Sequence, residues 1–93
     1  MTEELKLKEV IATGKGADEW LNHPQFRHVV TLIKAELVSQ FESTKFKDTA
    51  ERDEIWRKLQ SLNGIVNRME RLIRDGKTAE KTWLERFKDK IRG

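Results

Sequence analysis

The side chains of this sequence that could bind a phosphate are Arg57, Arg68 and Arg71. Their spacing places them on one side of a predicted helix, together with Gly64 and opposite its apolar residues. Such a stripe can contact a phosphate backbone or an acidic protein surface. Three acidic residues interrupt it: Glu54, Glu70 and Asp75. An ordinary solvated helix face is therefore the favoured interpretation, and nucleic-acid binding is the alternative.

The residues that could hold a metal or move a proton do not converge. His23 and His28 are five positions apart, and no pair of carboxylates completes a metal site with them. Neighbouring carboxylates such as Asp18 and Glu19 point apart on a helix. No nucleophile motif, no phosphate-binding loop and no cysteine occurs in the sequence. We therefore expect no enzyme activity, no metal and no cofactor.

Three tryptophans stand out because the chain has only 93 residues: Trp20, Trp56 and Trp83. Each lies beside or within the apolar face of a different predicted helical segment. They could form a shared aromatic core. They could equally anchor an interface, because tryptophan is enriched where binding energy concentrates. The sequence leaves both interpretations open.

Composition bounds the class of protein. The charged residues make up 38% of the chain, the hydrophobic ones 37%, and the formal net charge is +3. Clear apolar periodicity with one proline predicts a folded, helix-rich chain of a single domain, 1–93. The charged N-terminus does not resemble a signal peptide, and no apolar run reaches the ~20 residues of a membrane helix. We expect no membrane association, and a location in a host cytoplasm or a virion.

The first half of the chain predicts two helices, of which the second has the clearer sequence signals. Residues 3–12 favour a short helix, and the glycine-rich TGKG at 13–16 predicts a break, so that 1–16 is expected to be flexible. Pro24 suits the first turn of a helix, capped by Asn22 or His23, that runs over Pro24–Ser43. Its apolar face is spaced at helical intervals: Phe26, Val30, Ile33, Leu37 and Phe41.

The second half predicts a long helix over Asp48–Asp75 and a shorter last helix. The pattern D-x-x-E at 48–51 resembles a capping box, and Gly76 suits the left-handed residue that ends a helix. The last helix, within 78–93, would start at a Thr78 cap. The long helix carries an apolar seam with heptad spacing: Ile55, Leu59, Leu62, Val66, Met69 and Ile73.

The short link after Ser43 makes the two longer helices antiparallel neighbours in an all-α fold, a helical hairpin with shorter flanking helices. We expect Ile55–Leu62 to pack on Leu37 and Phe41, and Val66–Ile73 to meet Phe26 and Val30. The part of the seam that the hairpin leaves uncovered is available to the last helix, the first helix or another chain. We expect Val66–Ile73 also to meet Trp83 and Phe87, of the same chain or of a second one. The candidate interaction residues are Trp56, Val66, Met69, Ile73, Trp83 and Phe87. Mid-helix Gly64 would allow a further helix to approach closely.

Several of these stretches resemble a family of small tailed-bacteriophage proteins. The resemblance rests on A-x-x-W-L-x-x-P-x-F in ADEWLNHPQF, an amphipathic helix with a short S-T loop, RDEIWRKLQSLN, and IRDGKTA. It covers residues 17–79, and KTWLERFKDKIRG extends beyond it. Genes of this family tend to lie among virion-morphogenesis genes. The resemblance implies a helical hairpin with a role in head or tail assembly or an accessory role in infection, and it assigns no functional residue.

The expected function is therefore a non-enzymatic phage protein that interacts with itself or with another virion protein through an amphipathic helical face. A small DNA-associated protein using the three arginines, and an inhibitor of a host protein, are the alternatives.

Overall fold

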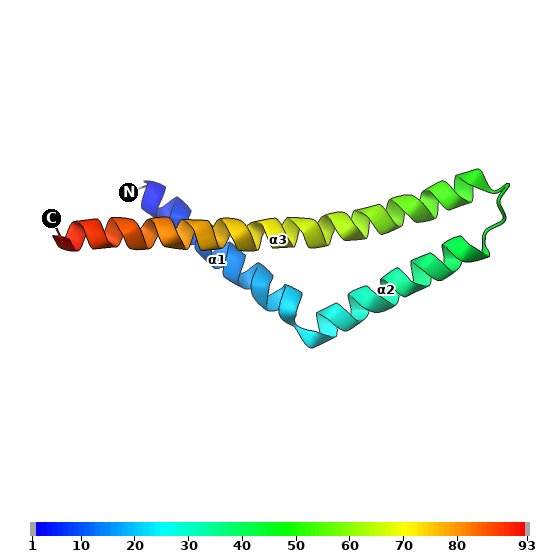
Figure 1. Cartoon of the computed structure of the whole chain (residues 1–93), viewed down its shortest axis with the longest axis horizontal. Helices are drawn as coiled ribbons and strands as arrows, with labels where there is room; N and C mark the ends of the chain where they lie inside the picture. The colour runs from blue at the N-terminus through cyan, green and yellow to red at the C-terminus, as the bar shows by residue number, and fades with distance from the viewer. Residues whose placement is uncertain (1, 93) are drawn as a thin grey trace. The chain divides into compact units, whose positions relative to one another are not determined.

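The computed structural model describes residues 2–92, and all of its elements are α-helices: α1 (Thr2–Asn22), α2 (Pro24–Ser43) and α3 (Thr49–Arg92) (Figure 1). The all-α prediction is confirmed. The helices build two compact units. Unit 1 contains residues 1–21 and 68–93, and unit 2 contains residues 22–67. Each unit pairs a separate helix with one part of α3.

Helix α2 has the bounds that its sequence predicts. His23 is extended, with φ −68° and ψ 124°, and its Nδ1 accepts a hydrogen bond of 3.2 Å from the Gln25 backbone N–H. A residue before proline avoids the helical region, so the helix starts at Pro24. At the other end the Thr44 N–H and its hydroxyl both donate to the Phe41 carbonyl oxygen. These bonds satisfy an end carbonyl that has no partner within the helix.

Helix α3 starts one residue after the predicted Asp48 but does not end where the sequence predicts. It is 44 residues long and continues through Gly76 and Thr78 to Arg92. Gly76 has no positive φ, so it is not a left-handed terminator. Thr78 is not a cap either, because it lies within α3, where its carbonyl accepts a 3.1 Å hydrogen bond from the Thr82 hydroxyl. The predicted separate C-terminal helix is thus the last part of α3; Gly93 lies outside the described residues.

Helix α1 also continues where the sequence predicts a break. It spans 21 residues, and the segment TGKG at 13–16 lies within it. Two glycines in four residues cost about 1 kcal/mol each relative to alanine in a helix. Packing within unit 1 offsets this cost at Gly14, which is buried.

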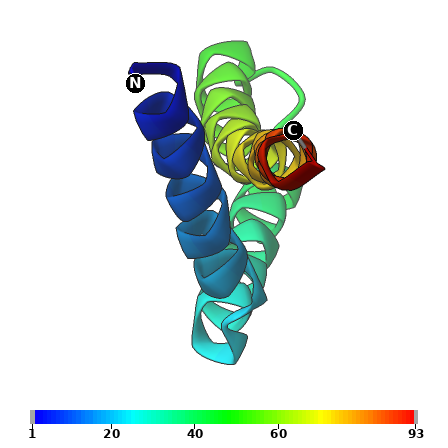
Figure 2. The same ribbon diagram turned by 90° about the vertical axis from the view of Figure 1, so that its left-hand side faces the viewer.

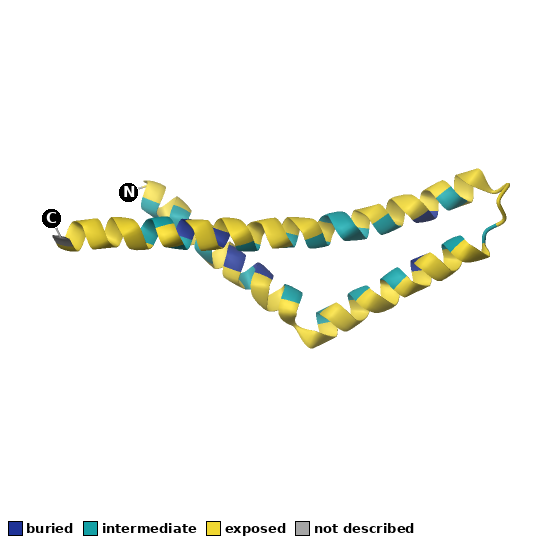
Figure 3. Cartoon of the chain, viewed as in Figure 1, coloured by how far each residue is buried: buried dark blue, intermediate teal, exposed yellow. Residues whose placement is uncertain are grey.

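Unit 2 is a helical hairpin of α2 and the first part of α3. Leu37 on α2 and Ile55 on α3 are its buried apolar side chains, 9% and 7% exposed, and Figure 3 shows buried patches on the facing sides of both helices. The Arg52 guanidinium lies 4.3 Å from the centre of the Phe41 ring, which ties the start of α3 to the end of α2. The predicted antiparallel pairing around Leu37 and Ile55 agrees with this arrangement.

Unit 1 is an antiparallel crossing of α1 with the last part of α3. Figure 2 shows α1 beside the C-terminal end of α3. Its buried residues are all small: Gly14, Ala17, Gly76 and Ala79. At one end of the crossing, Arg86 Nη1 lies 3.3 Å from Glu3 Oε2 and Lys90 Nζ lies 2.6 Å from Glu4 Oε1. Small residues therefore bring the backbones together, and ion pairs connect the two helices at one end.

Candidate functional site

The predicted interaction residues differ in how much surface they leave for a partner. Trp56 and Phe87 are 53% and 49% exposed. The other four are only partly exposed: Val66, Met69, Ile73 and Trp83. The two aromatic side chains are therefore the members of the predicted set with most surface to offer another protein.

Two of these partly exposed members, Trp83 and Ile73, have neighbours within unit 1. Trp83 stacks on Phe87, with ring centroids 5.6 Å apart and planes inclined by 8°. Ile73 lies beside Ile11 and Asp18 in a groove between α1 and α3. One part of the predicted seam thus packs on α1, the first helix, which was one of the candidate partners for the part of the seam that the hairpin leaves uncovered.

One of the two alternatives for the second part of the seam is excluded. Val66–Ile73 does not meet Trp83 and Phe87 of the same chain by a fold-back of the last helix, because all of these residues lie along the single continuous helix α3. Residues ten or more apart on one straight helix are separated by at least ~15 Å along its axis. Contact with their equivalents in a second chain stays a prediction.

An exposed apolar patch on α2 was missed. Val29, Leu32 and Ile33 are 50%, 55% and 40% exposed and lie at i, i+3 and i+4, so they form one surface, here called the α2 patch. Ile33 was predicted on the buried face. Ile33 is four positions from the buried Leu37 as well as from the exposed Val29, so its spacing alone does not show that it lies on the flank.

The loop between α2 and α3 carries the most exposed large apolar side chain of the described residues. Phe46 is 88% exposed and stands between Lys45 and Lys47. The Arg52 guanidinium lies 5.9 Å from its ring centre. The Asp48 N–H donates a 2.9 Å hydrogen bond to the Lys45 carbonyl, which closes this turn. The sequence analysis did not single out Phe46 because it belongs to no helical face.

The three predicted phosphate-binding arginines, Arg57, Arg68 and Arg71, are all exposed. Gly64 has open space around it: a Cβ built there meets no atom within 4 Å. The predicted close approach of another helix at Gly64 is thus not made by any described part of this chain. The close approach occurs instead at Gly14 and Gly76.

At that crossing the backbones of α1 and α3 nearly touch. A Cβ built on Gly14 would lie 2.9 Å from the Gly76 Cα, and one on Gly76 would lie 3.0 Å from the Gly14 Cα. Each would also meet a carbonyl oxygen of the opposite helix, that of Leu72 at 2.8 Å and that of Val10 at 3.3 Å. A Cβ at Gly14 would force the backbones apart, and one at Gly76 would be tighter than ordinary van der Waals contact, so the close packing depends most on Gly14.

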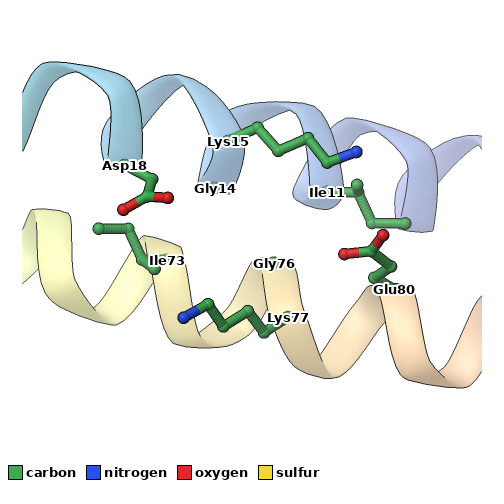
Figure 4. A pocket seen from close by; sticks show the side chains of 8 residues that line it. All are labelled: Ile11, Gly14, Lys15, Asp18, Ile73, Gly76, Lys77 and Glu80. Atoms are coloured by element: carbon green, nitrogen blue, oxygen red, sulfur yellow. The ribbon is translucent and has the colours of Figure 1, made fainter. Parts of the chain in front are cut away.

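A groove of about 180 Å³ runs across this contact, and the residues that line it come in matched pairs (Figure 4). They belong to two copies of one pattern, I-x-x-G-K-x-A-[DE], at residues 11–18 and 73–80. Lys15 extends toward the end of the groove near Glu80, and Lys77 extends the opposite way, toward the end near Asp18 (Figure 4). An approximate two-fold axis therefore relates the two copies of the pattern on the antiparallel helices.

The ion pairs at the end of the crossing are exposed, and one of them shifts the pKa of a carboxyl group. The hydrogen bond that Lys90 donates, with the positive charge of Lys90, lowers the pKa of Glu4 below its ordinary value. Lys90 and Glu4 also line a second groove of about 120 Å³ beside Trp83 and Phe87. This end of unit 1 therefore combines aromatic and charged surface.

The part of the chain that the structure describes holds neither a metal-binding cluster nor a helix suited to cross a membrane. Residues 2–92 contain no group of three or more histidine, aspartate or glutamate side chains placed to bind a metal ion. None of the described helices is both long and apolar enough to cross a membrane. His23, one of the two histidines considered above, caps α2.

Comparison with known proteins gives no relative: no family model matches the chain, and no curated protein and no solved structure is similar to it.

Proposed function

We propose that this chain is a non-enzymatic protein-interaction module whose helices bind another protein through exposed apolar side chains. The observation that carries the proposal is the exposure of Trp56 at 53% next to the buried Ile55 at 7%. A large aromatic side chain that the fold does not bury has its area free for a partner. Such residues commonly supply most of the binding energy of an interface.

The α2 patch supports the same function from the other helix of unit 2. Its three aliphatic side chains are each at least 40% exposed, and they are contiguous on one helix. Exposed apolar side chains that cluster indicate an interface more strongly than side chains that are scattered singly.

The class of partner follows from the resemblance to small tailed-bacteriophage proteins. It supports a virion protein as the partner, and a role in head or tail assembly. A host protein, bound during infection, is the other partner class consistent with the same surface.

The test uses the full chain with Leu32→Ser and Trp56→Ser, compared with an Ala35→Ser control on the same helix. The immobilised proteins are exposed to a lysate of phage-infected cells. We expect the double variant to retain at least ten-fold less of a partner protein than the wild-type chain and the control do. Its helix content by circular dichroism should be unchanged. Equal retention by all three proteins would contradict the proposal.

A second candidate function is binding to nucleic acid, which the exposure of Arg57, Arg68 and Arg71 favours. Phosphate contacts release counterions, so affinity for duplex DNA should fall steeply with salt. We would measure binding at two salt concentrations with the wild-type chain and with the triple variant in which each of these arginines is glutamine. An absence of binding at low salt would remove this function.

A further inference from the structure

The two helices that cross in unit 1 carry the same pattern in the same environment. The copies of I-x-x-G-K-x-A-[DE] start at Ile11 and Ile73, an offset of 62 residues. Several equivalent positions have similar exposure: Val10 and Leu72 are 38% and 41% exposed, and Ala17 and Ala79 are 9% and 6% exposed. The chain thus pairs two nearly equivalent helix faces with each other.

The contact between these faces is of the kind that joins identical subunits. In a two-fold contact, residue i of one partner meets residue j of the other and j meets i. Here the Cβ position of Gly14 faces the Gly76 Cα and the Leu72 carbonyl, and that of Gly76 faces the Gly14 Cα and the Val10 carbonyl. The charges obey the same relation, because the lysine of each copy extends toward the end of the groove that holds the acid of the other (Figure 4).

We propose that a second copy of this chain can make the same crossing, so that two chains exchange α1 and form a dimer. In the dimer, α1 of each chain crosses α3 of its partner through Gly14 and Gly76. Both crossings keep the ion pairs of Glu3 with Arg86 and of Glu4 with Lys90. The dimer therefore has the same contacts as two separate chains, and exchanging an identical element costs little.

Two features of α1 favour its exchange. The chain between α1 and α2 leaves the helical conformation at a single residue, His23, so a change of its φ and ψ redirects the whole helix. Opening the crossing also uncovers no fully buried large side chain, because the buried residues described there are two glycines and two alanines, while Ile11, Ile73 and Trp83 are already partly exposed. The intrachain pairing has the advantage of a high effective concentration, so exchange should increase with protein concentration.

The inference deepens the proposed function, on which it rests, because it names a second copy of the chain as one protein partner. It uses the crossing of α1 and α3, whereas the test of the proposed function uses Leu32 and Trp56. The two can therefore fail separately.

The experiment uses two full-length variants with opposite charge reversals. One carries Glu3→Lys and Glu4→Lys on α1, and the other carries Arg86→Glu and Lys90→Glu on α3. Within either variant the crossing brings like charges together. In a mixed dimer with exchanged α1 helices, both crossings pair opposite charges. We expect a 1:1 heterodimer by native mass spectrometry and sedimentation. Its Kd should be at least ten-fold below the Kd for self-association of either variant, and the association should weaken at high salt.

The control places all four substitutions in one chain, which restores opposite charges within it and should recover the melting temperature of the wild type. If this control recovers but the two variants do not associate on mixing, the crossing closes only within one chain and the inference is wrong. If a double reversal prevents folding, the single reversals Glu4→Lys and Lys90→Glu give the same mixed pairing with less repulsion. Formation of a heterodimer on mixing again supports the exchange, and its absence contradicts it. If no heterodimer forms but the chain still retains its partner through Trp56, the exchange of α1 is wrong and the proposed interaction function stands.

Discussion

Gly14 and Gly76 pack with their Cα atoms so close that a Cβ on Gly14 would lie 2.9 Å from the Gly76 Cα and 2.8 Å from the Leu72 carbonyl oxygen. The obstacles are backbone atoms, which cannot turn aside as the end of a flexible side chain can. A methyl group at Gly14 therefore requires the two helices to move apart, with loss of the contacts along the crossing.

The first prediction separates helix propensity from packing. Gly14→Ala should destabilise the chain, because an overpacking cost of about 1–3 kcal/mol exceeds the ~1 kcal/mol that alanine gains in a helix. Gly16→Ala, two residues away, should stabilise it, since a Cβ there meets no atom within 4 Å. Thermal unfolding followed by circular dichroism measures both. A higher melting temperature for Gly14→Ala would show that the crossing is not close-packed in solution.

The same contrast applies to α3. Gly76→Ala, whose Cβ would lie 3.0 Å from the Gly14 Cα, should lower the melting temperature. Gly64→Ala has open space and should raise it, by a few degrees for a gain of ~1 kcal/mol in a chain of this size. Equal effects of these two substitutions would be inconsistent with the structure.

These glycines also explain which parts of the fold follow from the sequence. Pro24, with His23 before it, marks the start of α2 because the ring of proline constrains its neighbour, and that constraint is local. The continuation of α1 and α3 through TGKG and through Gly76 is not local. Each glycine is tolerated in its helix because it packs on the other, 62 positions away in the sequence. The repeated I-x-x-G-K-x-A-[DE] pattern is the sequence signal that could have paired them.

The residues of the candidate site follow from the sequence only in part, for a similar reason. Heptad spacing identifies the apolar side of α3, but it does not tell which residues a second helix covers. Trp56 remains half exposed although it adjoins the seam, and Ile33 is 40% exposed although it was placed on the buried face. In a two-helix unit each helix buries only a narrow strip, so residues on the flank stay exposed.

A second prediction concerns pH. The hydrogen bond from Lys90 lowers the pKa of Glu4 in the folded chain, so the folded state favours the ionised carboxylate. A lowered carboxyl pKa gives stability that is present at neutral pH and is lost as the pH falls through the folded-state value. Lys90→Met should therefore lower the melting temperature at neutral pH, and the difference from wild type should shrink in acid. A difference that is the same at both pH values would contradict this origin; Lys88→Met is the matched control.

A third prediction concerns Arg52. Its guanidinium lies over the Phe41 ring at 4.3 Å and near Phe46 at 5.9 Å. Arg52→Gln keeps a polar side chain of similar length but removes the charge, and should cost about 0.5–1 kcal/mol. The control Arg57→Gln, at an exposed position of the same helix, should stay within about 0.5 kcal/mol of wild type. Chemical denaturation measures both, and equal stabilities would remove the cation–π contact as a stabilising feature of unit 2.

The last prediction uses two consecutive residues with opposite roles. Ile55 is 7% exposed and Trp56 is 53% exposed, although they are neighbours on one helix. Ile55→Ala should cost about 2–5 kcal/mol, because it leaves a cavity in the small core of unit 2. Trp56→Ala should cost less, about 1 kcal/mol, since Trp56 is already half exposed in the folded chain.

The two variants should exchange rank when binding is measured. Trp56→Ala should reduce affinity for the captured partner at least ten-fold while the chain stays folded, as expected of an interface anchor. Ile55→Ala should lose affinity only to the extent that it unfolds, so its binding should recover at lower temperature, where the folded fraction is higher. If Trp56→Ala instead unfolds the chain, the indole belongs to a core that the folded monomer buries. If it keeps both stability and binding, the partner uses another surface, and the α2 patch becomes the next one to test by Leu32→Ser.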